Sequence, residues 1–131
     1  MTVVNDCYNA NPMSMLAALD DLAATTENQS PPARRVAVLG DMLELGPDER
    51  RFHAEVGAHA RSRGVDVLVT VGPRAAIMAA PFGGEVHLAE TAADAAELVP
   101  ALVQPGDTVL VKASRGVGLE VVAEALDAAR A

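Results

Sequence analysis

Residues 108–118 read Thr-Val-Leu-Val-Lys-Ala-Ser-Arg-Gly-Val-Gly, and this stretch decides the fold class. Its first five residues, 108–112, form a continuous apolar run closed by a lysine, without the alternation of apolar and polar side chains that a half-exposed strand shows. A continuous run is typical of a strand buried on both faces, as in a parallel sheet covered by helices. A glycine-containing loop follows, and then a helical pattern from 119 to about 129. The stretch therefore predicts one strand, loop and helix of an α/β fold.

Four more β-rich runs precede this stretch, mostly continuous Val and Leu runs as well. The five predicted strands are 2–6, 35–39, 66–71, 85–88 and 108–112. Helical patterns separate them, and strands that alternate with helices predict βαβ units around a parallel sheet. We therefore expect a three-layer α/β/α sandwich with all five strands parallel.

The helices are predicted from caps and apolar spacing. Asn11 is a good N-cap for a helix that begins at Pro12, and Thr91 with Asp94 has the spacing of a capping box. We expect Pro100 to end or kink the helix after Thr91. Another helix is expected to begin near Asp48 and to end at Gly64. A shorter helix is expected to begin at Pro73 and to run through Ile77. Residues 25–33 are expected to form a solvated loop.

Composition excludes several classes of protein. The chain has 131 residues, which fits one domain, and a net charge of −8, which leaves no basic face for a nucleic-acid backbone. No apolar run approaches the roughly 18 residues that span a bilayer, and no secretion signal opens the chain. Cys7 is the single cysteine, so no internal disulfide is possible. We expect a cytoplasmic protein with no nucleic-acid or membrane partner.

Polar residues follow three of the predicted strands, in the segments 5–12, 40–46 and 112–118. In an open α/β sheet, ligands bind beyond the carboxyl ends of the strands, where these loops meet helix N-termini. The three segments therefore mark a candidate crevice. No segment matches a phosphate-binding P-loop, and Val121 breaks the dinucleotide pattern G-x-G-x-x-G that begins at Gly116.

Lys112 and Arg115 are the strongest ligand candidates. Lys112 is the only lysine of the chain, and it ends a buried strand. An ammonium suits a phosphate or carboxylate, and the Arg115 guanidinium can bind a carboxylate through two hydrogen bonds. The alternative is a salt bridge within the loops, to Asp6 or Asp41. We expect the loss of either cation to weaken ligand binding and to leave the stability of the fold nearly unchanged.

Other side chains of the three segments have a structural and a functional interpretation. Asn9 and Asn11 are turn and cap formers, and Tyr8 could pack over a helix start. Glu44 lies among apolar residues, where an unpaired carboxylate is costly, so a partner or ligand is implied. His53 could face the crevice from the second helix. Cys7 is interpreted as a small buried side chain, and no His, Cys and carboxylate set has the spacing of metal ligands, so we expect no metal site.

Three motifs together resemble the C-terminal domain of the Mur ligases. They are Asn-Asp-Cys-Tyr-Asn-Ala-Asn-Pro at 5–12, Leu-Gly-Asp-Met-Leu-Glu-Leu-Gly at 39–46 with a histidine after it, and Val-Lys-Ala-Ser-Arg-Gly at 111–116. Within this family they are most similar to the branch that adds D-Ala-D-Ala to UDP-N-acetylmuramoyl-tripeptide. The resemblance covers nearly the whole chain.

The resemblance implies a Rossmann-like sheet with strand order 1-5-2-3-4, and it implies that residues 1–131 are the third domain of a three-domain, ATP-dependent ligase of peptidoglycan synthesis. Such ligases phosphorylate the acceptor carboxylate, and the amine of the dipeptide then attacks the acyl-phosphate. ATP and Mg²⁺ are held mainly by an upstream domain, so we expect no cofactor and no activity in this chain alone. The residues implied to face the substrate are Lys112, Ser114, Arg115, Glu44 and His53, and those implied to face the nucleotide are Asp6, Tyr8, Asn9 and Asn11.

Alternatives remain open at the level of the sequence. A sister ligase that adds a single amino acid would share the fold and the general chemistry. A receiver or other flavodoxin-like module would need an acidic pocket with a phospho-acceptor and a separate lysine, for which Asp41 and Lys112 are candidates. A purely structural dimerisation domain would leave Glu44, Lys112 and Arg115 as mutual salt bridges.

Overall fold

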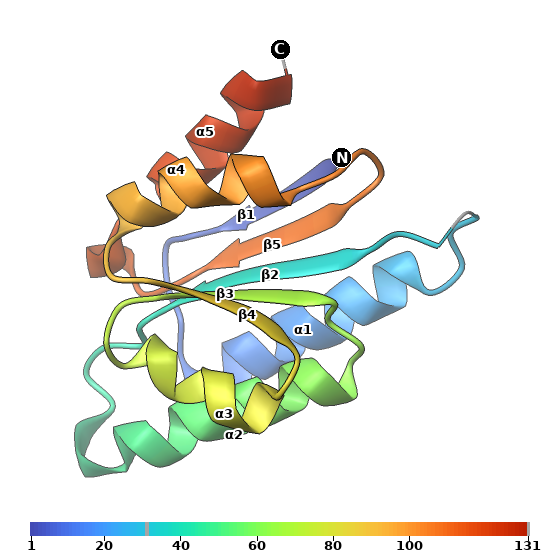
Figure 1. Ribbon diagram of the computed structural model, residues 1–131. Helices are drawn as coiled ribbons and strands as arrows, with labels where there is room; N and C mark the ends of the chain where they lie inside the picture. Colours follow the sequence, from blue (N-terminus) through green and yellow to red (C-terminus); the bar gives the residue numbers. More distant parts are fainter. Residues whose placement is uncertain (31, 131) are drawn as a thin grey trace.

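The computed structural model describes residues 1–30 and 32–130, and its centre is one five-stranded sheet. The strands are β1 (Thr2–Asp6), β2 (Arg35–Gly40), β3 (Val67–Val71), β4 (Glu85–Ala89) and β5 (Thr108–Lys112). Every neighbouring pair is parallel and the order is β1-β5-β2-β3-β4 (Figure 1). The predicted direction and order of the strands are therefore confirmed.

The register brings the loops of the three sequence motifs to the same edge of the sheet. Lys112 of β5 lies opposite Asp6 of β1 on one side and Leu39 of β2 on the other. Because all three strands run in the same direction, the segments that leave them begin side by side. The order with β5 between β1 and β2 is what makes a shared crevice geometrically possible.

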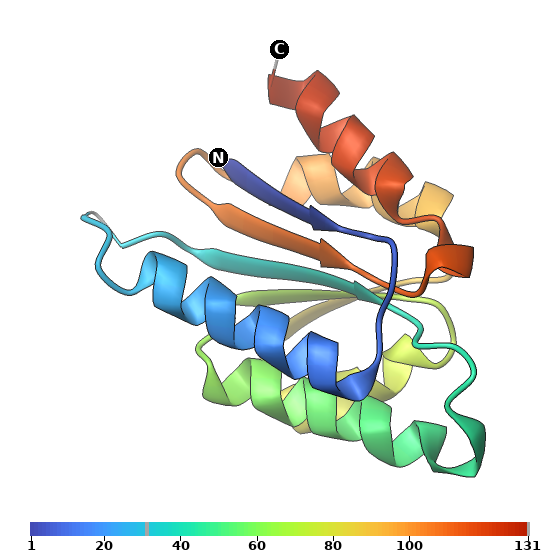
Figure 2. The same cartoon turned by 180° about the vertical axis from the view of Figure 1, so that it is seen from behind.

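Helices cover both faces of the sheet and complete the predicted three layers (Figures 1 and 2). One face carries α1 (Pro12–Thr26), α2 (Glu49–Ser62) and the short α3 (Ala79–Phe82), and the other carries α4 (Ala92–Leu102) and α5 (Glu120–Arg130). Each face has its own apolar core, one around Leu39 and Leu68, and the other around Val38 and Val69. Successive strand residues therefore serve opposite cores.

Position in the sheet decides how far a strand is buried. All five residues of β5 and of β3 are buried, as their continuous apolar runs predict. The same expectation is wrong for the two edge strands, since Val4 of β1 is 44% exposed and Leu88 of β4 is 60% exposed. Edge strands lack a neighbour on one side and are less covered, and residue composition alone does not reveal the edge position.

Helix ends differ from the predictions in three places. α1 continues through Thr26, whose hydroxyl donates to the Leu22 carbonyl at 2.7 Å, so the expected loop 25–33 begins later, and Pro31 of that loop lies outside the described residues. α4 does not end at Pro100 but runs to Leu102, because a proline in the last turn removes only one hydrogen bond. The segment after Pro73 begins as a 3₁₀ helix, Ala75–Met78.

No helix in the described part of the chain combines the length and the apolar composition needed to cross a bilayer.

Candidate functional site

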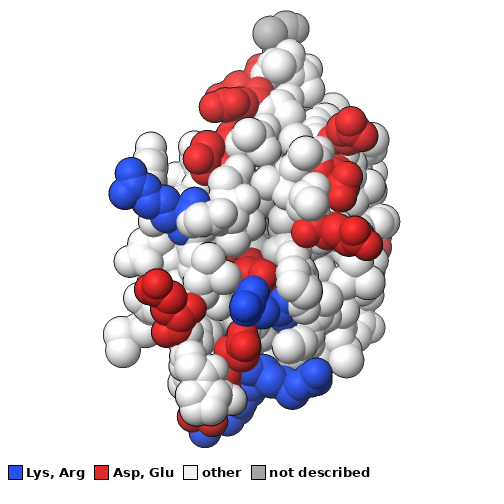
Figure 3. Space-filling view, turned by 90° about the vertical axis from the view of Figure 1, so that its left-hand side faces the viewer, with Lys and Arg blue, Asp and Glu red and all other residues white. Residues whose placement is uncertain are grey.

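A crevice opens where the loops after β1, β2 and β5 meet. Its volume is about 380 Å³. The residues that line it come from all three loops: Tyr8, Asn9, Ala10, Leu43, Glu44, Ser114, Arg115 and Gly116. Figure 3 looks onto this edge of the molecule, which carries cationic and anionic side chains close together. The structure therefore brings Tyr8, Asn9, Glu44, Ser114 and Arg115 of the predicted site together.

Arg115 is a cation at the crevice that has no partner among the described residues. It is exposed and begins a short 3₁₀ helix, Arg115–Val117. Among the arginines whose side chains the structure describes, only Arg50 and Arg115 have no hydrogen bond, ion pair or ring contact with the described residues. A guanidinium that no protein group satisfies remains available to a carboxylate or phosphate.

Ser114 ties the three loops to one another. Its hydroxyl accepts a hydrogen bond from the Leu43 N–H at 2.9 Å and donates to the Ala10 carbonyl at 3.5 Å. Its own N–H donates to the Asp41 carbonyl at 3.2 Å. The side chain lines the crevice while it fixes the distance between the loops after β1 and β2.

Lys112 does not line the crevice. Its residue is 3% exposed, and its Nζ donates to the Asp6 carboxylate at 2.6 Å and to the Asn9 carbonyl at 3.0 Å. The alternative of a salt bridge to Asp6 is thus present in the structure. The expectation that its loss leaves stability unchanged is wrong in its premise, because it treated the ammonium as an exposed charge.

Asp41 and Lys112 belong to separate networks, which removes the basis of the receiver interpretation. Asp41 is 5% exposed, and its carboxylate accepts from the Ala75 N–H at 2.7 Å and from Arg74 at 3.3 Å. The hydrogen bonds to Glu49 and Asp41 raise the pKa of the Arg74 guanidinium. Gly72 has φ +106° and must stay small, since a Cβ there would lie 2.5 Å from the Asp41 Oδ1.

Glu44 is exposed, so the expectation that a partner must offset its burial is wrong. The reason is a turn that single-sequence reasoning missed: Glu44 has φ +62° and is the only described non-glycine residue with a positive φ. That conformation turns the segment at Glu44, two residues after the fully buried Met42. The carboxylate stands at the crevice in contact with water.

His53 is fully buried behind the loop after β2, not on the surface of the crevice. Its Nε2 accepts from the Met42 N–H at 3.0 Å, and its Nδ1 lies 2.7 Å from the Glu49 carbonyl. His53 therefore contacts the crevice only through the loop that it holds.

Asn11 has the capping role that its position predicts. Its side chain accepts from the Ser14 N–H at 2.9 Å, and the Ser14 hydroxyl accepts from the Asn11 N–H at 3.0 Å, which together form a capping box. Cys7 is 2% exposed, which confirms its interpretation as a small buried side chain, and burial raises the pKa of its thiol to about 11.

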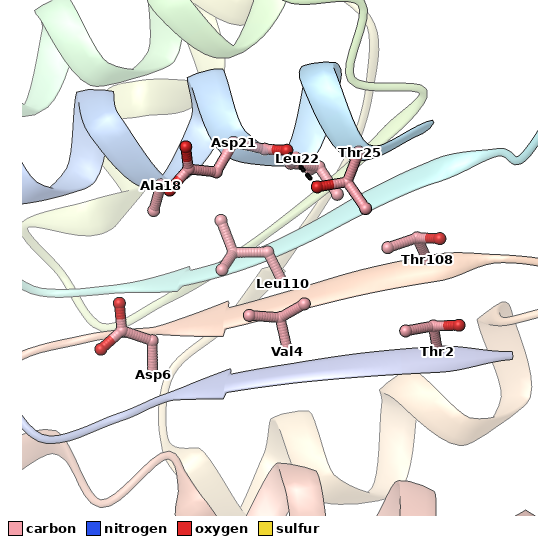
Figure 4. A pocket seen from close by; sticks show the side chains of 9 residues that line it. All are labelled: Thr2, Val4, Asp6, Ala18, Asp21, Leu22, Thr25, Thr108 and Leu110. Atoms are coloured by element: carbon pink, nitrogen blue, oxygen red, sulfur yellow. Dashed lines mark hydrogen bonds between the residues drawn. The ribbon is translucent and has the colours of Figure 1, made fainter. Parts of the chain in front are cut away.

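A second hollow, of about 170 Å³, lies between the exposed side of β1 and α1 (Figure 4). Val4 and Leu110 form its floor and Ala18 and Leu22 its opposite wall. Among the predicted site residues only Asp6 reaches it. It is an apolar gap beside an edge strand, separate from the crevice.

Sequence reasoning missed Ala10 and Leu43 as lining residues. They carry no charge or chemistry of their own, and only their position inside the three motifs signals them. Within residues 1–30 and 32–130, no three His, Cys, Asp or Glu side chains are grouped closely enough to hold a metal ion.

The fold and the crevice define an α/β domain with a polar crevice between loops at the carboxyl edge of a parallel sheet, which is where domains of this class bind ligands. The family model described as "Mur ligase, glutamate ligase domain" matches residues 1–115. The chain belongs to this family, which confirms the resemblance of its three motifs.

Two relatives and one crystal structure show which members of the family the chain is similar to. The chain is 43% identical, over 96% of its length, to the UDP-N-acetylmuramoyl-tripeptide–D-alanyl-D-alanine ligase of Mycobacterium leprae, and 36% identical, over 95%, to that of Escherichia coli. It spans 28% and 26% of these two proteins. The crystal structure of MurF ligase from Thermotoga maritima in complex with ADP superposes with a TM-score of 0.78 at 28% identity, covering 98% of this chain and 29% of that one.

Proposed function

We propose that this chain is the dipeptide-binding domain of an ATP-dependent ligase that joins D-Ala-D-Ala to UDP-N-acetylmuramoyl-tripeptide in peptidoglycan precursor synthesis. The relatives that carry this activity in their names support the proposal, and the chain matches little more than a quarter of each. The remaining domains, which would bind the UDP-sugar and ATP, are proposed to lie upstream. We propose that the reaction takes place in the cytoplasm.

The observation that carries the proposal is the unsatisfied Arg115 guanidinium in a crevice built by the three motif loops. A dipeptide presents one carboxylate and one amine, and the acyl-phosphate of the acceptor presents further negative charge. Arg115 can bind such an anion through two parallel hydrogen bonds, and Gly116 beside it exposes its backbone. Glu44, which also lines the crevice, is available to an ammonium group.

The chain's own residues orient the reactants in this mechanism. ATP, held with Mg²⁺ mainly by the proposed upstream domain, supplies the phosphoryl group that activates the acceptor carboxylate. The amine nitrogen of the dipeptide bonds to the acyl carbon and releases a proton to water or to the departing phosphate, the carbon–oxygen bond to phosphate breaks, and inorganic phosphate leaves. Arg115 and Ser114 hold the incoming dipeptide near that carbon, and positioning of this kind lowers the barrier. Tyr8 and Asn9 are proposed to face the nucleotide.

The test uses the complete ligase and this chain side by side. We expect the complete protein to form the amide and release phosphate only when ATP, the UDP-tripeptide and D-Ala-D-Ala are all present, and this chain alone to turn over no ATP. Activity with a single amino acid but none with the dipeptide would reassign the protein to a sister ligase. ATP turnover by the isolated chain would contradict the proposal.

A further inference from the structure

Both ring nitrogens of His53 form hydrogen bonds with backbone groups. The residue is fully buried in the first turns of α2. Its Nε2 is 3.0 Å from the Met42 nitrogen, and its Nδ1 is 2.7 Å from the Glu49 carbonyl oxygen. A backbone N–H only donates and a carbonyl only accepts, so Nε2 must be the acceptor and Nδ1 must carry the hydrogen. The two contacts select one neutral tautomer and leave no nitrogen for a ligand.

The segment that His53 holds is the wall of the crevice. Met42 precedes Leu43 and Glu44, which both line the crevice. The Leu43 N–H is in turn held by the Ser114 hydroxyl at 2.9 Å. Two successive N–H groups are therefore anchored from two sides, one by α2 and one by the loop after β5.

The anchored segment contains the backbone strain of the site. Glu44 has φ +62°, a left-handed conformation that is unfavourable for a non-glycine residue. Such a conformation persists only where the surroundings impose it. The Glu44 side chain has no hydrogen bond within the described residues, and the hydrogen bonds at Met42 and Leu43 hold the two residues that precede it.

We propose that His53 is a positioning residue: as a neutral acceptor for the Met42 N–H, it holds Leu43 and Glu44 in the shape that the incoming dipeptide needs. The proposal rests on the proposed function for the identity of the ligand, and on the structure alone for the anchoring. It differs from a packing role because it requires an acceptor at the position of Nε2, not merely a side chain of the right volume.

Three substitutions of His53 distinguish a hydrogen-bond acceptor from a side chain that only fills the volume. In His53→Gln, the longer amide can place its oxygen where Nε2 lies and accept from Met42 again. In His53→Asn, the amide reaches only the position of Nδ1, and in His53→Leu the volume is kept without any acceptor. The matched control is His59→Gln, on the same helix, where the partly exposed ring contacts Asp20 at 2.7 Å, far from Met42 in the sequence and outside the crevice lining.

The first measurement is hydrogen exchange of the Met42 amide in this chain, with the amides of β5 as the internal reference for global unfolding. We expect Met42 protection to fall at least tenfold in His53→Leu and His53→Asn relative to the β5 amides, and to be retained in His53→Gln and His59→Gln. A Gln variant no better than the Leu variant, including one that fails to fold, overturns the proposal.

The second measurement is steady-state kinetics in the complete ligase. We expect KM for D-Ala-D-Ala to rise about tenfold in the Leu and Asn variants, the size of one lost hydrogen bond, and to recover in the Gln variant, with KM for ATP within twofold of the unsubstituted enzyme throughout. Equal losses for ATP and dipeptide overturn the positioning role. If the unsubstituted enzyme itself ignores the dipeptide, the proposed function fails, and the Met42 exchange pattern still decides the anchoring.

Discussion

The Lys112 ammonium lies between the Asp6 carboxylate and the Asn9 carbonyl, at 2.6 Å and 3.0 Å. Its side chain is 4% exposed, whereas that of Asp6 is 46% exposed. Losing the ion pair therefore costs more free energy at the buried lysine than at the aspartate, since only the aspartate carboxylate is exposed enough to be hydrated instead. Lys112 also joins the loop after β1 to the end of β5, and that loop carries Tyr8 and Asn9 into the crevice.

We expect Lys112→Ala to lower the free energy of unfolding by about 2 kcal/mol, because two charge-assisted hydrogen bonds and a packed stem are lost. Lys112→Met keeps most of the stem and should lose less. Urea unfolding of both variants measures the difference. An alanine variant as stable as the natural protein would show that the ammonium is not a structural partner of β1.

Thr70 offers a stability test at a site unrelated to function. It is fully buried in β3, and its hydroxyl oxygen has no hydrogen-bond partner among the described residues. Thr70→Val replaces the hydroxyl by a methyl group of similar size, so we expect a gain of about 1 kcal/mol in the free energy of unfolding.

The matched control for Thr70 is Thr26→Val. Thr26 is equally buried, but its hydroxyl donates to Leu22 and accepts from Arg35. Thermal unfolding should therefore show opposite signs for the two substitutions. A loss of stability in Thr70→Val would mean that the hydroxyl has a partner that the described residues do not supply.

At the scale of elements, α1 is defined at its start by one residue. The Asn11 side chain accepts a hydrogen bond from the Ser14 N–H, and the Ser14 hydroxyl accepts one from the Asn11 N–H. Pro12 begins the first turn. We expect Asn11→Ala to cost about 1 kcal/mol of stability and Asn11→Ser, another good cap, to cost little. Thermal unfolding of the two variants measures this.

The same pair of variants separates the cap from a ligand role. If Asn11 is only a cap, the serine variant of the complete ligase keeps its KM for ATP. A serine variant that is stable but has a raised KM for ATP would instead support the nucleotide-facing role that the resemblance implies for Asn11.

How much of each element could be predicted depends on how local its cause is. The ends of β1 and β5 and the cap of α1 follow from adjacent residues, and they are confirmed. The order β1-β5-β2-β3-β4 is a long-range pairing, and it came from the resemblance of the motifs. The exposure of Val4 and Leu88 could not be predicted from composition, because it depends on which strands lie at the edges.

The candidate site was predicted by segment, whereas its contacts were at most one of two interpretations, as for the salt bridge of Lys112 to Asp6. That three polar loops share one edge follows from a parallel sheet. That Lys112 turns to Asp6, that His53 turns to Met42 and that Glu44 points outward depends on distances of a few ångströms between loops that are remote in sequence. Residue types alone do not contain those distances.

At the scale of the whole molecule, most of the cationic side chains that the structure describes have partners within the protein. The net charge is −8, and most arginines whose side chains are described, together with the single lysine, contact carboxylates or carbonyls of the protein. Within residues 1–30 and 32–130, Arg115 at the crevice and Arg50 on α2 have no such partner. That distribution leaves a guanidinium without a protein partner at the crevice of a chain that is acidic overall, and we propose that this group binds the anion.

The most direct test of the account compares Arg115→Ala with Arg50→Ala in the complete ligase, since both arginines are exposed and free of partners among the described residues. We expect both variants to keep the unfolding free energy within about 0.5 kcal/mol. Steady-state kcat/KM for D-Ala-D-Ala should fall roughly tenfold to a hundredfold in Arg115→Ala, the size of a charge-assisted hydrogen bond to the ligand, and stay unchanged in Arg50→Ala. Unchanged kcat/KM in a folded Arg115→Ala enzyme would contradict the assignment of the crevice as the dipeptide site.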